Sequence, residues 1–193
     1  MADFELTAYS GDCVVHAILD LPDGQRLSDF LNDAGTIALT NVKLQALDDG
    51  RVVELADLDL DLDLDDVCAV ISPAEQRGSG QRRIRTRTAR VEIKLGPYEV
   101  LGHLHGPTSG DPLLAVSRRQ RMIPVTEATI AYTMAGQTRI LDLDVIVFNR
   151  DLAKMVTQVK YEPSKIDDFG YSKVDPNARD LTHELYVSRP MDE

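Results

Sequence analysis

The feature that most constrains the fold of this chain is an internal similarity between two β-like segments, 86 positions apart. Residues 36–47 read TIALTNVKLQAL, and residues 122–133 read MIPVTEATIAYT. In both, apolar residues occupy alternate positions until the phase slips by one residue, near Thr40 and near Thr126. Because the side chains of a strand alternate strictly between its faces, the slip predicts a β-bulge or sharp bend in each segment. We interpret the pair as a tandem duplication of a small β domain.

The flanking sequence repeats the same order of predicted elements. Alternating residues at 4–9 and 91–95 predict a first strand in each copy, and apolar runs at 13–21 and 98–105 predict a second. Each second run ends at a turn that contains proline and is followed by a short stretch with helical spacing. The duplication therefore extends well beyond the two similar segments.

The first helical stretch, RLSDFLN at 26–32, has Leu27, Phe30 and Leu31 on one face. We expect Ser28 to be its N-cap, because a serine oxygen can accept a bond from the free amides of the first turn. The second copy keeps the apolar spacing but not the polar residues. One short helical turn is therefore predicted in each copy.

The rest of each copy is predicted to be β. A turn at Asp48-Asp49-Gly50 leads into a long strand over 51–66, in which leucines and aspartates alternate, and a final apolar run closes each copy. We predict a mainly β protein built from two SH3-like or Sm-like barrels, with a β-sandwich of both copies as the alternative. The predicted boundaries are 1–72 for the first barrel, 73–89 for an Arg-rich linker, 90–160 for the second barrel and 161–193 for a C-terminal strap or tail.

The formal net charge of −11 disfavours nucleic acid and anionic membranes as partners, since both require a surplus of Lys and Arg. Cys13 and Cys68 are too few for a disulfide framework and lie in apolar runs. No run approaches the ~18 apolar residues of a membrane span. The N-terminal MADFEL lacks the features of a signal peptide. We expect a cytoplasmic protein without a cofactor.

Two sets of polar residues are candidate binding sites. In the first helical stretch, Arg26, Ser28, Asp29 and Asn32 are candidates for a protein partner, although Ser28 and Asp29 can equally be a cap and a helix-dipole partner. Basic residues follow a Gly-Ser-Gly stretch and are candidates for an anionic ligand such as a nucleotide, or for neutralisation by the aspartates of 57–66. This basic set is Arg82, Arg83, Arg85 and Arg87.

Two patterns resemble metal sites, and we expect neither to bind metal. His103 and His105 form an H-x-H on a predicted strand, but a transition-metal site requires a third ligand, and none is near in sequence. The alternating aspartates of 57–66 lack the glycine and terminal glutamate of a calcium loop. Aspartates on one strand face are also about 7 Å apart, too far to share one ion.

The sequence contains none of the familiar catalytic motifs, such as a P-loop, a dinucleotide fingerprint or a nucleophile elbow. His16 lies in an apolar strand, where a histidine is more often a hydrogen-bonded structural residue than a general base. We therefore expect a protein that is not an enzyme.

The RLSDFLN stretch followed by the apolar run Ile37–Thr40 resembles a poorly characterised bacterial small-barrel domain family whose signature is R-L-S-D-x-L-N. The resemblance covers about 50 residues of the first copy and, in the second, only the strand that contains Thr126. It implies a bacterial origin and a small barrel, and it implies no activity. Taken together, these patterns predict an interaction or scaffold protein that binds a protein partner or itself. A sensor of a small anionic ligand is the alternative.

Overall fold

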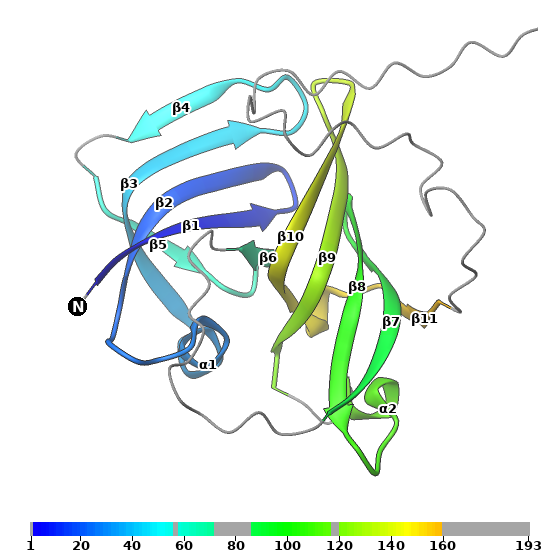
Figure 1. Cartoon of the computed structure of the whole chain (residues 1–193). Helices are drawn as coiled ribbons and strands as arrows, with labels where there is room; N and C mark the ends of the chain where they lie inside the picture. The colour runs from blue at the N-terminus through cyan, green and yellow to red at the C-terminus, as the bar shows by residue number, and fades with distance from the viewer. Residues whose placement is uncertain (1, 56–57, 72–85, 117–119, 160–193) are drawn as a thin grey trace, which may run out of the picture. The chain divides into compact units, whose positions relative to one another are not determined.

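The computed structural model describes residues 2–55, 58–71, 86–116 and 120–159, which fall in one compact unit, Met1–Val159. The predicted linker and C-terminal tail therefore lie largely outside the described residues. The described chain is mainly β, as predicted. Figure 1 labels the strands and α-helices among its elements. The elements are β1 (Ala2–Ser10), β2 (Cys13–Leu21), α1 (Leu27–Asp33), β3 (Thr36–Ala46), β4 (Val52–Leu55), β5 (Leu60–Asp63), β6 (Val67–Ile71), β7 (Thr86–Leu95), β8 (Tyr98–Pro107), α2 (Pro112–Val116), β9 (Met122–Met134), β10 (Gln137–Asn149), the 3-10 helix η1 (Arg150–Leu152) and β11 (Met155–Gln158).

The strands form a single open antiparallel sheet in the order β11-β7-β8-β9-β10-β6-β1-β2-β3-β4, with β5 also paired to β3. The predicted pair of SH3-like or Sm-like barrels is not confirmed, because this sheet is not closed. We call the described residues 2–71 the first half and 86–159 the second half. The order of strand, strand, helix and strand is the same at the start of both halves.

The alternation seen in the sequence explains which strand faces are buried. In β1, Phe4, Leu6 and Ala8 are buried and Glu5 is exposed. The same pattern covers β7 and β8, where hydrophobic residues are fully or nearly fully buried at every second position. Side chains on one face of a strand share one environment, so the apolar faces of these strands pack into a core.

Both predicted bulges are present. Ala17 of β2 lies opposite two residues of β3, of which Asn41 has a φ of 52°. Gly102 of β8 likewise lies opposite two residues of β9, of which Glu127 has a φ of 48°. An extra residue in the left-handed conformation shifts the side-chain alternation by one position, which accounts for the phase slip in both segments.

Strand pairing joins the two halves. β6 pairs with β1 on one side and with β10 on the other, where Val70 lies opposite Val147 and Ala69 opposite Phe148. Both hydrophobic cores contain residues from both halves. One packs Tyr9 of the first half with Tyr98 and Tyr132 of the second. The joint is therefore part of the core and not a surface contact.

Backbone groups at the joint are bonded by two asparagines. The amide of Asn32 donates to the Met122 carbonyl and accepts from the Met122 N–H, each at 2.8 Å. Asn149, which is buried, donates to the Leu64 carbonyl at 3.0 Å. Buried backbone groups without partners are costly, and these side chains satisfy them where the regular strand ladder ends.

Two sequence predictions are wrong in detail. Ser28 is not the N-cap, because α1 begins at Leu27 and Arg26 occupies the cap position without a side-chain capping bond. The long strand expected over 51–66 is broken into β4 and β5, which pair with successive segments of β3. The break lies opposite the bulge at Asn41, whereas β10 continues past the equivalent bulge. The alternation of leucine and aspartate begins only at Asp57, and Leu55 is in the opposite phase, so the prediction of one continuous strand overlooked this change.

Candidate functional site

The β4–β5 edge, by which we mean the outer side of Val52–Leu55 and Leu60–Asp63, ends the sheet on one side. β4 and β5 each pair only with β3 among the described residues. Val52 and Val53 are each 42% exposed, and Leu58 beside the break is 63% exposed. An edge strand presents unpaired backbone donors and acceptors, and natural proteins shorten or charge such edges to prevent unwanted pairing. Here the edge is short but keeps an exposed apolar surface.

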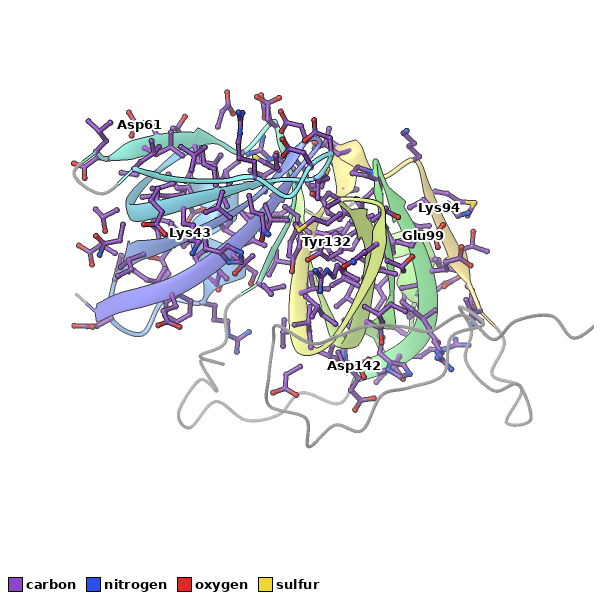
Figure 2. All side chains as sticks on the ribbon, turned by 90° about the horizontal axis from the view of Figure 1, so that it is seen from above. Lys43, Asp61, Lys94, Glu99, Tyr132 and Asp142 are labelled. Atoms are coloured by element: carbon purple, nitrogen blue, oxygen red, sulfur yellow. The ribbon has the colours of Figure 1, made fainter. Side chains whose placement is uncertain are left out.

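Acidic side chains surround this apolar surface. Glu54 lies on β4 and makes an ion pair with Lys43 of β3 at 3.3 Å. Asp61 of β5 is exposed and lies at the outer end of the sheet in Figure 2. The neighbouring exposed acids are Asp48, Asp49, Asp59, Asp63, Asp65 and Asp66. The β4–β5 edge therefore combines strand backbone that pairs on one side among the described residues, exposed valines and negative charge.

The β11 edge, which is the outer side of Met155–Gln158, ends the sheet on the other side. β11 pairs only with β7 among the described residues, and Met155 is 40% exposed. Lys154 is exposed directly before it. On the adjacent hairpin Lys94 lies 3.6 Å from Glu99 and 3.8 Å from Glu92 (Figure 2). This edge is less acidic than the β4–β5 edge.

The residues predicted to bind a partner lie at α1. Arg26 and Asp29 are exposed, and Ser28 is half-buried. Asn32 is already bonded to Met122 and also donates to the Ser28 carbonyl at 2.7 Å. Its amide therefore has a structural role at the joint, and the partner-binding role of the set remains a prediction.

Three of the four arginines predicted to bind an anion, Arg82, Arg83 and Arg85, lie outside the described residues. Arg87 is exposed on β7, which begins at Thr86, within the segment predicted as a linker. The anion-binding role of this set also remains a prediction.

His103 and His105 are half-buried on β8 and make separate contacts. His105 bonds to the hydroxyls of Thr86 at 3.0 Å and Thr126 at 2.7 Å through its two ring nitrogens. His103 Nδ1 lies 3.2 Å from a Glu127 carboxylate oxygen, an ion-pair distance without the alignment of a hydrogen bond. Within the described ranges, no group of three or more His, Cys, Asp or Glu side chains could hold a metal ion.

The other candidate reactive groups are bonded or buried. His16 is exposed on β2 and lies 3.0 Å from the Thr7 hydroxyl, consistent with its predicted structural role. Burial raises the pKa of the Cys13 and Cys68 thiols, which disfavours the reactive thiolate. Both cysteines are free.

The described part of the chain contains no helix long and apolar enough to cross a membrane. Comparison with protein-family models, with curated proteins and with solved structures finds no match for this chain. The resemblance of RLSDFLN to a bacterial domain family therefore stays a prediction.

Sequence reasoning did not identify the two edges as candidate sites. The exposed pair Val52-Val53 follows a predicted turn, but the sequence does not state which neighbour a strand has. The one available signal was the row of aspartates, which is a typical protection of an edge strand.

Proposed function

We propose that this protein is a non-enzymatic scaffold, derived from a tandem duplication, that binds an extended segment of a partner protein as an added strand at β4. The observation that supports this most directly is that β4 ends the sheet with Val52 and Val53 each 42% exposed. An extended peptide that adds to an edge gains affinity from backbone bonds and specificity from alternate side chains.

The surrounding charge indicates which peptide would bind. The exposed acids beside β4 and β5 attract lysine and arginine and repel acidic segments. Apolar residues at every second position of the peptide lie on one face and would cover Val53, which shares the face of Leu55, while Val52 points to the opposite face. We therefore expect a basic partner segment in which apolar and basic residues alternate.

Peptide binding measured by fluorescence anisotropy tests the proposal. The probe is a labelled peptide of roughly eight residues, a typical strand length, in which Lys and Val alternate. A Glu-Val peptide of equal length tests charge, and a Lys-Val peptide N-methylated at alternate residues tests backbone pairing. We expect the unmodified Lys-Val peptide to bind and the Glu-Val peptide not to bind. N-methylation should weaken binding of the Lys-Val peptide about tenfold or more.

Val53→Lys, which places a cation on the edge strand, should weaken binding of the Lys-Val peptide. Thr133→Lys is the matched control, because Thr133 is exposed on β9 in the other half. Equal binding of all three peptides, or equal effects of the two substitutions, would show non-specific adsorption and contradict the proposal. Failure of every peptide to bind would also contradict it.

A further inference from the structure

The pairing of β6 with β10 is a strand-to-strand contact between the two halves of the molecule. It places Val70 opposite Val147 and Ala69 opposite Phe148, and all four side chains are at most 3% exposed. The contact joins different surfaces, since one half contributes its last strand and the other half contributes the end of its fourth strand. Such a contact can in principle be repeated, because each half has both kinds of surface.

β11 occupies the place in the second half that β6 occupies in the first. Ala69 of β6 pairs with Tyr9 of β1, and Met155 of β11 pairs with Lys94 of β7. Tyr9 and Lys94 hold equivalent positions, each one residue before the end of the first strand of a hairpin with a two-residue turn. Met155 is therefore the counterpart of Ala69.

β5 corresponds in the same way to the end of β10. Leu60 pairs with Leu39 on β3, and Ile146 pairs with Val125 on β9. Leu39 and Val125 both precede the bulge of their strand, so Leu60 is the counterpart of Ile146. The two surfaces that meet inside the molecule thus recur at its two ends, where β5 and β11 each have one neighbouring strand among the described residues.

We propose that β11 of one molecule pairs with β5 of another in the manner of the internal β6–β10 pairing. When the register of the internal β6–β10 pairing is applied to β11 and β5, Met155 lies opposite Leu62. Val156 then lies opposite Asp61, and Lys154 opposite Asp63. This inference extends the proposed scaffold function from a foreign partner to a second copy of this chain.

Two of the three pairs brought together by this register are complementary, and the third sets Val156 opposite the exposed Asp61. Met155 is 40% exposed and Leu62 is half-buried, so each offers apolar surface to cover. Lys154 and Asp63 are both exposed and carry opposite charges. This contact is more polar than the internal one, which suits an association that forms between separate molecules. Because the contact is heterologous, its repetition gives a ring if the rotation closes and a filament if it does not.

The association leaves the proposed peptide site open. Among the described residues, the pairing of β6 with β10 involves Val147 and Phe148 of β10. The segment of β10 around Leu143, which corresponds to β4, pairs only with β9 among the described residues. A second molecule on β5 would therefore leave β4 free to bind a peptide.

The test is the molar mass of the full chain, measured by light scattering after size exclusion across a concentration series. The wild type should form assemblies larger than a monomer. Asp63→Lys alone and Lys154→Asp alone should each weaken assembly about tenfold or more, because each creates a pair of like charges at the contact. An equimolar mixture of the two variants should assemble again, because every contact between one variant and the other then pairs a lysine with an aspartate.

Two controls separate charge effects from folding. The Asp63 carboxylate accepts a bond from the Asp65 N–H at 2.9 Å, so Asp63→Asn tests the loss of charge while keeping an acceptor. It should weaken assembly less than Asp63→Lys. Asp20→Lys makes the same charge change at an exposed position on β2 and should leave assembly unchanged.

A monomeric wild type at all concentrations, or an assembly that neither single variant weakens, would overturn the inference. So would a mixture that fails to assemble when both variants are folded by circular dichroism. The peptide proposal has a separate result, because Val53→Lys should weaken peptide binding and leave the mass of the assembly unchanged.

Discussion

Asn41 and Glu127 have the same left-handed backbone conformation, with φ of 52° and 48°, at bulges in the corresponding strands β3 and β9. A left-handed conformation costs a residue with a Cβ roughly 1–2 kcal/mol, and less for asparagine, whose short side chain tolerates it. Both halves therefore retain a conformation that opposes the local preference of the backbone, because the bulge sets the register of the strands around it.

Glu127→Gly should increase the free energy of unfolding by ~1 kcal/mol, because glycine adopts this conformation without the Cβ penalty. The contact with His103 is lost, but the Glu127 carboxylate is largely exposed, so this loss is small. Chemical denaturation measures the change. Glu127→Gln, which keeps the Cβ and removes the charge, should not stabilise the protein, and equal stabilisation by both would contradict this explanation.

Gly102→Ala should lower the free energy of unfolding by ~1–3 kcal/mol through overpacking. An added Cβ would lie 2.5 Å from Val125 Cγ1 and 3.1 Å from Ala128 Cα, opposite the bulge. Gly35→Ala is the matched control, since a Cβ there would meet no atom within 4 Å. Thermal unfolding of both variants checks the prediction, and an equal loss at the two glycines would argue against a steric cause.

Asn32→Ala should lower the free energy of unfolding by ~2–3 kcal/mol, because it leaves both backbone groups of Met122 without their partner. Asn32→Asp keeps the acceptor for the Met122 N–H but directs a carboxylate oxygen at the Met122 carbonyl, so it should also destabilise the protein. Urea denaturation gives both values. Asp33→Ala, at the exposed last residue of α1, should have little effect.

Stability should fall at alkaline pH because tyrosines are buried at the joint. Burial is the main cause that raises the pKa of Tyr98 above its ordinary value of about 10, and the pKa of Tyr9 is raised mainly by the same cause. The raised pKa favours the neutral phenol in the folded state. The stabilisation from each neutral phenol is complete at pH values below the pKa that the tyrosine has in the unfolded chain. It is lost as pH rises from there towards the pKa in the folded protein.

Tyr98→Phe separates this effect from general alkaline unfolding. The Tyr98 hydroxyl donates to the Ser10 carbonyl at 2.6 Å, so the substitution should cost ~1 kcal/mol at neutral pH. It should also reduce the decline of stability above pH ~10. Denaturation at a series of pH values measures both effects, and an unchanged slope would show that Tyr98 is not responsible for the decline.

Local patterns in the sequence predicted most of the strands, the helix α1 and both bulges, but not the division of 51–66 into β4 and β5. The alternation of apolar residues depends only on which face of a strand is buried, and the phase slip at Thr40 and Thr126 is visible within a single segment. The prediction of Ser28 as the cap of α1 was wrong, because a serine near the helix start does not fix where the helix begins. Arg26 occupies the cap position instead.

The tertiary structure decided which strands are neighbours. The pairing of β6 with β10, the partner of Asn32 90 residues away and the position of β4 at the end of the described sheet depend on contacts between distant segments. The alternation of apolar and polar residues indicates that a strand has a buried face. It does not indicate which strands are neighbours, because the hydrogen bonds at the two edges of a strand involve the backbone, which is the same for nearly every residue. Local patterns therefore predicted most of the strands, and only the folded chain decided which strands pair and which of them end the described sheet.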